Sequence, residues 1–214
     1  MSDKTVSAAT LELIRDLQSD IPLKDFVLVG GTALSLQLGH RISVDIDFFT
    51  RNQFHNQELL EFLEKKYGFQ MQYMHSNTLK GIINGVFVDF LTHDYSMVAE
   101  PLIKDGIILA SLEDIAAMKV NAITGNGTRV KDFIDIYFLL KRYSFSQIIE
   151  FYKIKYTTRN DFHAIKSLTW FEDVIIEEWP NMLLEKGLTF SKLKREIIHR
   201  RDMFLDKEKS DFAS

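Results

Sequence analysis

The fold of this chain is decided by two stretches, Val29-Gly30-Gly31-Thr32 and, after twelve intervening residues, Asp45-Ile46-Asp47-Phe48. The first stretch closes a short apolar run that starts at Phe26, and this pattern predicts a buried strand that enters a tight turn. Thr32 is a suitable N-cap for a short helix that ends near Gly39. The second stretch predicts the next strand, over residues 44–49.

Asp45 and Asp47 carry the chemistry of the second stretch. Residues two apart in a strand point to the same side, so we expect these carboxylates to share one face. Val44, Ile46 and Phe48 would then pack on a core from the other face. Two neighbouring carboxylates repel each other, and a fold keeps them together at low cost when a cation lies between them. Mg²⁺ takes oxygen ligands of this type.

Asp89 is the candidate third acid, because it lies within the apolar strand predicted over residues 86–91. A lone carboxylate in such a strand is expensive to bury unless it is paired or bound to metal. We therefore expect Asp45, Asp47 and Asp89 to bind one or two Mg²⁺ ions. Two ions about 3.5–4 Å apart can activate an attacking oxygen and stabilise a leaving one in an in-line displacement.

The Gly-Gly turn supplies the complementary half of the predicted site. Gly30 and Gly31 lack a Cβ, so the backbone can approach a bulky anion closely. Their amides, together with Thr32 and the start of the following helix, would donate hydrogen bonds to phosphate oxygens. The sequence therefore predicts that the turn holds a nucleoside triphosphate while Asp45 and Asp47 hold its metal ion.

The rest of the pattern predicts an α+β fold in two parts. Residues 1–110 are expected to form a mixed sheet with flanking helices, and residues 111–214 a helical region. Within the first part the pattern predicts helices over 7–17, 32–38 and 57–67, and strands over 26–29, 44–49, 69–73, 82–83 and 86–91. Within the second part it predicts helices over 111–123 and 129–142, a loop over 125–128, and a basic stretch over 191–201.

Composition limits the class of protein. The chain has 214 residues, of which 46% are hydrophobic and 26% are charged, with no cysteine, three prolines and ten glycines. Disulfides and cysteine-based zinc sites are therefore excluded. The sequence shows neither a long apolar run nor a signal peptide, so we expect a cytoplasmic protein that does not enter a membrane.

The net charge of −4 is unevenly distributed along the chain. Residues 1–140 carry 12 Lys and Arg against 18 Asp and Glu, and residues 141–214 carry 14 against 12. This asymmetry fits an acidic metal site in residues 1–140 and contact with a polyanion in residues 141–214. It also fits ordinary variation of surface charge. The basic residues of 191–201 also allow two interpretations, because their surface could bind RNA phosphates or simply be solvated.

Three longer motifs add to the Gly-Gly turn and the Asp-x-Asp pair. They are Gly30-Gly31-Thr32-Ala33-Leu34, then Arg41-x-Ser43-x-Asp45-Ile46-Asp47-Phe48, and finally Lys119-x-x-Ala122 with Arg129-x-Lys131-Asp132-x-x-Asp135-Ile136-Tyr137. Together they resemble the AbiEii-type nucleotidyltransferase toxins of the DNA polymerase β-like nucleotidyltransferase superfamily. The resemblance covers about residues 25–140, and the last 70 residues carry no motif of this kind.

The resemblance implies a Mg²⁺-dependent nucleotidyltransferase with the fold of that superfamily. Its role would be that of a toxin in a bacterial toxin–antitoxin or phage-defence pair, with a cognate antitoxin as partner. It would transfer a nucleoside monophosphate from a triphosphate to an RNA acceptor, with tRNA favoured.

The resemblance also implies roles for residues outside the three acids. Lys119 would face the active site, where it could neutralise triphosphate charge or protonate the departing pyrophosphate. Asp132 and Asp135 lie three apart and so share a helix face, from which one could orient Lys119 or the acceptor. Arg129 and Ser43 join the expected nucleotide contacts. Arg41 could contact phosphate or form a structural pair with Asp45.

Three alternatives stay open from the sequence. The chain could be a non-catalytic protein of the same fold that binds a partner protein or RNA. It could be a nucleotidyltransferase whose acceptor is a small molecule, such as an aminoglycoside, or a protein. Lys119, Asp132 and Asp135 could be ordinary helix residues, solvated or ion-paired, without a part in transfer.

Overall fold

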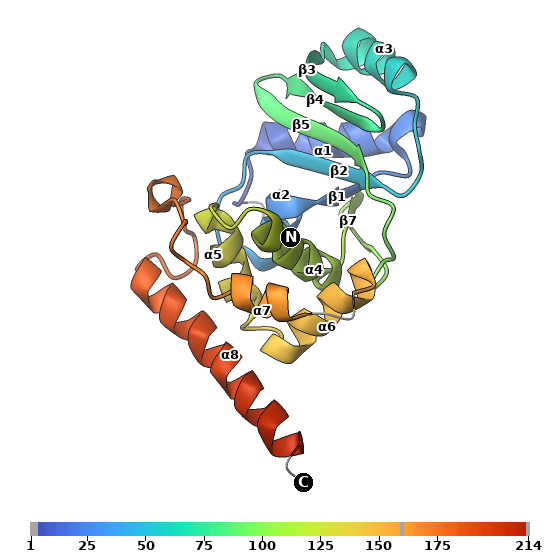
Figure 1. Ribbon diagram of the computed structural model, residues 1–214. Helices are drawn as coiled ribbons and strands as arrows, with labels where there is room; N and C mark the ends of the chain where they lie inside the picture. Colours follow the sequence, from blue (N-terminus) through green and yellow to red (C-terminus); the bar gives the residue numbers. More distant parts are fainter. Residues whose placement is uncertain (1–3, 159–160, 213–214) are drawn as a thin grey trace. The chain divides into compact units, whose positions relative to one another are not determined.

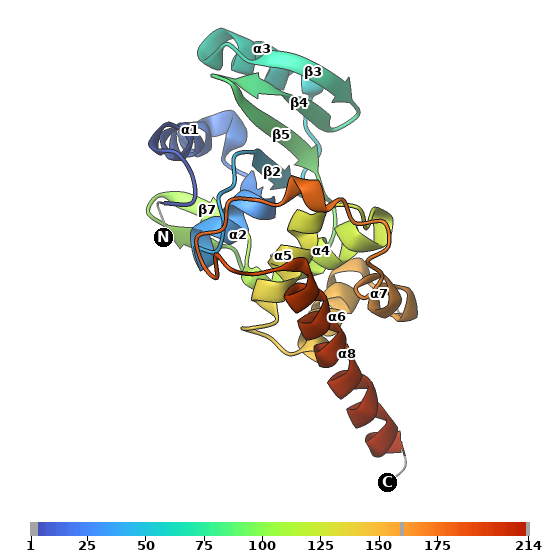
Figure 2. The same cartoon turned by 90° about the vertical axis from the view of Figure 1, so that its left-hand side faces the viewer.

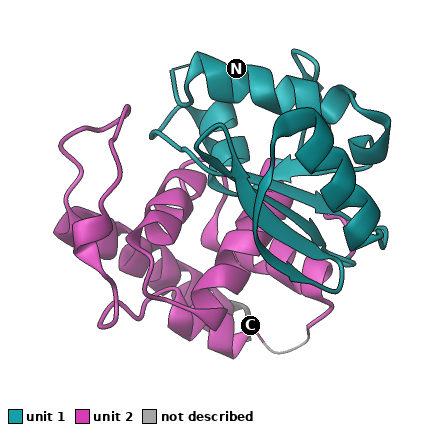
Figure 3. Cartoon of the chain, turned by 90° about the horizontal axis from the view of Figure 1, so that it is seen from above, with its two compact units in different colours: residues 1–95, 100–111 teal, residues 96–99, 112–214 magenta. Residues whose placement is uncertain are grey.

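The chain folds into two compact units in the computed structural model, which describes residues 4–158 and 161–212 (Figure 1). Unit 1 comprises Met1–Tyr95 and Glu100–Ser111, and unit 2 comprises Ser96–Ala99 and Leu112–Ser214 (Figure 3). Each unit is described separately below. No helix of the described residues is long and apolar enough to cross a membrane.

Unit 1 is built on one sheet of seven strands in the order β3-β4-β5-β2-β1-β7-β6. β1 pairs with β7 and β2 pairs with β5 in parallel, while the other neighbouring pairs are antiparallel, so the sheet is mixed. The strands are β1 (Val27–Val29), β2 (Ile46–Thr50), β3 (Gln70–His75), β4 (Thr78–Ile83), β5 (Val86–Thr92), β6 (Leu102–Lys104) and β7 (Ile107–Leu109).

The helices of unit 1 are α1 (Ala8–Ser19), η1 (Ile21–Leu23, a 3-10 turn), α2 (Gly30–Leu38) and α3 (Asn56–Tyr67). Ser7 caps α1 by accepting a hydrogen bond from the amide of Thr10 at 3.0 Å, which satisfies one of the first-turn amides. α3 lies against β3 and β4 (Figures 1 and 2).

One face of the sheet forms the core of unit 1. Along β2, β4 and β5 buried residues alternate with partly exposed ones, as expected when one face packs on a core and the other does not. The buried face includes Phe48, Leu79, Val88 and Phe90, each at most 1% exposed. Phe90 stacks on Phe48 with ring centroids 5.6 Å apart. Asp47 and Asp89 of the predicted site lie on the opposite, less covered face.

Unit 2 is helical in its described part. Its helices are α4 (Leu112–Gly125), α5 (Val130–Leu139), α6 (Phe145–Tyr156), α7 (Phe162–Ser167), the 3-10 turn η2 (Ile176–Glu178) and α8 (Phe190–Phe212). α4 packs against α5, α6 and α7, and α8 contacts α5 and α6 before it runs on toward the C-terminus (Figure 2). Ser144 and Gln147 form a reciprocal capping box at the start of α6.

The predicted α+β class, with a mixed sheet followed by a helical region, is confirmed. Two strands, β6 and β7, were not among the predicted elements. The prediction for residues 44–49 was partly wrong, because β2 begins only at Ile46 and Val44 is 62% exposed. Val44 therefore does not join Ile46 and Phe48 in the core.

Candidate active site

The turn between β1 and α2 lies directly against the acidic strand β2. Gly30 begins α2 with φ +68°, a conformation that side chains with a Cβ rarely adopt. A Cβ at Gly30 would also overlap Oδ2 of Asp47. Glycine thus allows the backbone to turn from strand to helix while it touches the carboxylate. The start of α2 has no side-chain cap and no acidic residue in its first turn. Its first backbone amides can therefore donate hydrogen bonds to an anion.

Gly31 gives close access to two further predicted residues. A Cβ at Gly31 would overlap the guanidinium of Arg41 and would lie 3.2 Å from Oγ of Ser43. Arg41 is 3% exposed and Ser43 is 8% exposed. The nearly buried guanidinium of Arg41 donates to the carbonyl of Ile42 at 3.1 Å. The structure therefore places Arg41 and Ser43 at the Gly-Gly turn, and their expected contact with a nucleotide stays a prediction.

Thr32 has a different local role from the predicted one. α2 begins at Gly30 and its N-cap is Val29, so Thr32 is not the N-cap. Because Gly30 takes the positive φ, the helix can start two residues earlier than expected. The fully buried Thr32 instead donates its hydroxyl hydrogen to the carbonyl oxygen of Asp45. This bond ties the first turn of α2 to the residue that precedes β2.

The carboxylates of β2 and β5 lie side by side. Asp47 and Asp89 are direct partners in the parallel register of these strands, so their side chains project from the same face of the sheet. Asp45 precedes β2 in an irregular segment, so its placement does not follow from strand alternation. Both Asp47 and Asp89 are partly exposed.

Asp89 already has a cationic partner in this structure. Nζ of Lys80, on the neighbouring strand β4, lies 2.5 Å from Oδ2 of Asp89. The side chains of Lys80 and Asp89 are 40% and 23% exposed, so solvent screens the pair. Sequence reasoning missed Lys80, because only the β4–β5 register places it opposite Asp89.

The donor chemistry of these carboxylates suits a hard divalent cation. Asp47 and Asp89 offer oxygen ligands on one face, and Asp45 lies two residues from Asp47. Within residues 4–158 and 161–212, however, no three His, Cys, Asp or Glu side chains are arranged to hold one metal ion together. Binding of a metal by Asp89 would require its carboxylate to exchange Lys80 for the ion.

The predicted residues of unit 2 form a buried ionic cluster of their own. Nζ of Lys119 on α4 lies 2.6 Å from Oδ1 of Asp132 and 2.8 Å from Oδ2 of Asp135, both on α5. The side chains of the three residues are at most 9% exposed. Arg129 is more exposed, and its Nε lies 3.9 Å from Asp132. Lys119 is therefore an ion-paired interior residue, and the part of this cluster in nucleotide transfer stays a prediction.

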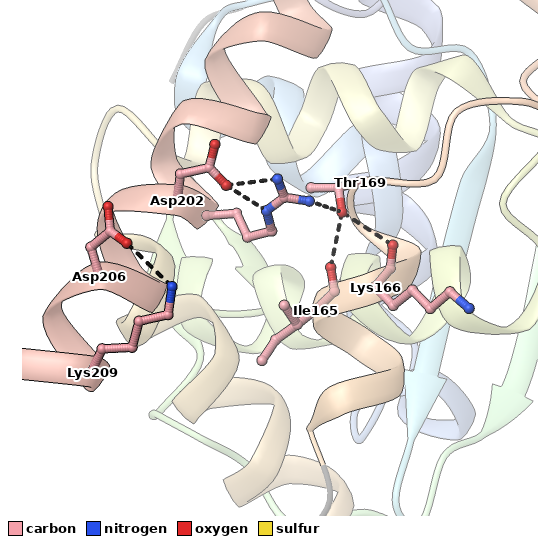
Figure 4. A network of polar contacts seen from close by, with 7 residues as sticks. Ile165, Lys166, Thr169, Asp202, Asp206 and Lys209 are labelled. Carbon is pink, nitrogen blue, oxygen red and sulfur yellow. Dashed lines mark hydrogen bonds and ion pairs between the residues drawn. The ribbon is translucent and has the colours of Figure 1, made fainter. Parts of the chain in front are cut away.

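The basic residues of 191–201 are engaged mainly within unit 2. Lys192 lies 3.0 Å from Glu185, and Arg200 lies 2.8 Å from Glu196. Arg201 binds Asp202 at 2.6 Å and donates to the hydroxyl of Thr169 at 3.0 Å (Figure 4). These local pairs reduce the positive charge that α8 can offer to a polyanion.

The geometry can be set against known proteins. A model of the family described as "Nucleotidyl transferase AbiEii toxin, Type IV TA system" matches residues 13–84 and 84–210. This chain belongs to the AbiEii nucleotidyltransferase family. The family resemblance and the enzyme class expected from the sequence are thereby confirmed: the chain is a nucleotidyltransferase. The match also extends over α6, α7 and most of α8, beyond the residues that carry the sequence motifs.

Relatives of this AbiEii-family chain include proteins of similar sequence and of similar fold. The uncharacterized protein aq_aa25 of Aquifex aeolicus (strain VF5) is 34% identical over 155 residues, which cover 70% of this chain and 75% of the relative. The crystal structure of JHP933 from Helicobacter pylori is similar with a TM-score of 0.57 and 16% identity, over 97% of each chain.

A second similar structure is that of the antibiotic-resistance factor ANT(2'')-Ia, with a TM-score of 0.54 and 13% identity. The similarity covers 71% of this chain and 91% of that one. The two structural likenesses concern the fold alone. The fold is that of the nucleotidyltransferases, as the sequence predicted.

Proposed function

We propose that this chain transfers a nucleoside monophosphate from a nucleoside triphosphate to an RNA acceptor, with tRNA favoured, in a Mg²⁺-dependent reaction. Its biological role would be that of the toxin in a toxin–antitoxin or phage-defence system, with a cognate antitoxin as partner. The family description supports the toxin role, and nucleotidyl transfer itself follows from the family.

The observation that carries this proposal is the contact between the Gly-Gly turn and the acidic strand. Gly30 lies so close to Asp47 that a methyl group would not fit between them, and Asp47 lies beside Asp89. Phosphate oxygens at the start of α2 would therefore be next to two carboxylates. A divalent cation held by these carboxylates would therefore lie next to the phosphates whose charge it would neutralise.

Asp47 and Asp89, together with Asp45 just before β2, would hold the metal once Asp89 had exchanged Lys80 for the ion. When bound, Mg²⁺ would neutralise phosphate charge and polarise the reacting oxygens. The protein groups would position the other participants. Gly30 and Gly31 would donate backbone hydrogen bonds to the phosphates. Arg41 and Ser43, which lie next to Gly31, would hold the turn in place beside the nucleotide. Asp89 would accept the proton of the acceptor hydroxyl while the hydroxyl oxygen attacks the α-phosphate and the pyrophosphate leaves.

The proposed activity can be tested with purified protein, Mg²⁺, total bacterial RNA and each α-³²P-labelled triphosphate in turn. We expect label on a discrete RNA band with the parent protein. The Asp47→Asn variant should fold like the parent and transfer nothing, because it loses a charged oxygen ligand but keeps its shape. Transfer by this variant at the parental rate would exclude the assignment of Asp47.

Other acceptors are outcomes of the same assay. Label that appears only when total protein or a set of small-molecule acceptors replaces RNA would keep the nucleotidyltransferase but change its substrate. An absence of label on RNA, protein and small molecules, with all four nucleotides, would favour a non-catalytic role in binding a partner.

A further inference from the structure

A row of four side chains crosses the open face of the sheet in unit 1. The strand register pairs Asp47 with Asp89, Asp89 with Lys80, and Lys80 with Tyr73. Residues directly opposite each other in neighbouring strands share a face. The row therefore leads from the two carboxylates over a cation to an aromatic side chain on the edge strand β3, in steps of about 4.8 Å.

The outer end of this row is exposed to solvent. All six residues of β3 are exposed, and Tyr73 is 51% exposed. His75, two residues further along β3, stacks on Tyr73 with ring centroids 6.5 Å apart and an interplanar angle of 20°. Phe87, on the same face of β5, is also 51% exposed. Tyr73 and His75 thus present adjoining ring surfaces to solvent, and exposed apolar surface gathered in one place marks interaction sites.

The geometry of phosphoryl transfer indicates the side of Asp47 from which an acceptor would approach. The start of α2 and Gly30 lie on the β1 side of Asp47, because β1 and β5 flank β2 on opposite sides. In phosphoryl transfer the attacking and leaving oxygens lie roughly in line. A triphosphate held at the Gly-Gly turn places its leaving pyrophosphate on that side. An acceptor hydroxyl in line with that leaving group would then approach from the side of β5, β4 and β3.

We propose that the open face formed by Lys80, Tyr73 and His75, here called the β3–β4 surface, binds the single-stranded 3′ end of the RNA acceptor. A base stacks on Tyr73 and His75, Lys80 contacts a backbone phosphate, and the terminal ribose reaches Asp89. Aromatic platforms beside cations are how proteins bind single-stranded nucleic acid without sequence preference. This inference rests on the proposed function, since it names the binding surface for that acceptor.

The β3–β4 surface offers a phosphate one cation, which it shares with Asp89. Lys80 is the cation of the row and is 40% exposed at its side chain while it pairs with Asp89. A phosphate near Lys80 adds a second anionic partner to a cation that solvent already reaches. A duplex fits less well, because stacking and pairing leave only the outer face of its terminal base pair free to cover Tyr73.

The test measures binding of a fluorescein-labelled single-stranded oligoribonucleotide of about eight nucleotides by fluorescence anisotropy, without triphosphate. The informative variant is Tyr73→Ala. The matched controls are Met71→Ala and Met74→Ala, on the same strand and 44% and 41% exposed. They pair with Gly81 and Leu79, which belong to the buried face, so they lie on the opposite side of β3.

We expect Tyr73→Ala to weaken binding at least about fivefold, the effect of losing one stacked base. The two methionine variants should bind like the parent, and all three variants should remain folded at the temperature of the assay. Lys80→Ala should lower the slope of log affinity against log salt by about 0.7, the change for one phosphate contact to a single strand. The duplex form of the oligonucleotide should bind more weakly than the single strand.

Equal binding by Tyr73→Ala and Met71→Ala would overturn this inference, as would the absence of oligonucleotide binding by the parent. Failure of the proposed function would look different. In that case the labelled-triphosphate assay would give no product on RNA, whereas the Tyr73-dependent binding of the oligonucleotide would persist. Conversely, intact transfer with Tyr73-independent binding would leave the proposed function standing and remove only the β3–β4 surface.

Discussion

Gly30 illustrates how a single methyl group could change the site. A Cβ at this position would be strained at φ +68° and would also collide with Asp47. Gly68 provides a matched control, because it has φ +62° and open space around the position of a Cβ. Both positions test the cost of a left-handed conformation, but only Gly30 tests the contact with the carboxylate.

We predict that Gly30→Ala and Gly68→Ala each lower the free energy of unfolding by about 1–2 kcal/mol for the left-handed conformation. Gly30→Ala should in addition abolish nucleotide transfer, because Asp47 must move to admit the methyl group. Urea unfolding and the labelled-triphosphate assay would measure the two effects. Full activity in Gly30→Ala would show that the contact between the turn and Asp47 is not needed.

Lys119 is a second residue whose substitution has a defined expectation. It lies between Asp132 and Asp135 in the interior of unit 2. Lys119→Met should lower the free energy of unfolding by about 3–5 kcal/mol, because it leaves buried carboxylates without the cation they share. Combining it with Asp132→Asn and Asp135→Asn should restore much of that loss. A parental unfolding midpoint for Lys119→Met alone would contradict the ion-pair assignment.

Closeness in sequence accounts for part of the candidate site, while the nucleotide contacts expected of its residues stay predictions. Arg41 and Ser43 lie near the Gly-Gly turn in both sequence and space. Lys80 could not be found in this way, because its contact with Asp89 depends on the register of a hairpin. A shift of one residue in that register would place Lys80 on the other face of the sheet.

At the scale of elements, boundaries were harder to predict than element types. The short strands β6 and β7 were missed, although Asp105-Gly106 between them has the φ values of +52° and +79° that a tight hairpin turn requires. An Asp-Gly pair between apolar residues is a hairpin signal, so this feature could have been read from the sequence. The early start of α2 could not, because it depends on the backbone that Gly30 adopts.

The junction of α1 and α3 yields a prediction on pH. Asp20 follows α1 and accepts hydrogen bonds from Lys66 at 2.5 Å and from the hydroxyl of Tyr67, both at the end of α3. Burial alone would raise the pKa of Asp20, but the bonds from Lys66 and Tyr67 and the charge of Lys66 outweigh it. The pKa therefore lies below its ordinary value of 3.8.

Because the folded-state pKa is lowered, the ionised Asp20 stabilises the fold above its ordinary pKa and loses this effect as the pH falls through the folded value. Asp20→Asn should therefore be less stable than the parent at neutral pH, and the difference should shrink below about pH 4. Urea unfolding at a series of pH values would measure it, with Glu12→Gln on the exposed face of α1 as control. A difference that does not change with pH would contradict this assignment.

At the scale of the whole molecule, the chain passes from unit 1 into unit 2 and back before it enters unit 2 for the last time. Residues 96–99 lie between β5 and β6 in sequence but belong to unit 2. Asp114 of α4 accepts hydrogen bonds from the amides of Val98 and Ala99, and Lys155 of α6 binds both Asp114 at 2.7 Å and the carbonyl of Ser96. A four-residue segment such as 96–99 differs in composition from neither unit. A single domain boundary predicted from sequence therefore cannot assign it to unit 2.

The central claim is that the Gly-Gly turn and the adjacent carboxylates of unit 1 hold a metal–triphosphate complex. The most direct measurement is thermal unfolding with Mg²⁺ and each triphosphate, for the parent, Asp47→Asn and Gly68→Ala. At about 100 times the dissociation constant, binding should stabilise the parent by about 2.7 kcal/mol, or roughly 5 °C or more. Gly68→Ala should show the same increment and Asp47→Asn should show none. Equal Mg²⁺-dependent stabilisation of Asp47→Asn and the parent, or no stabilisation of the parent by any triphosphate, would contradict the claim.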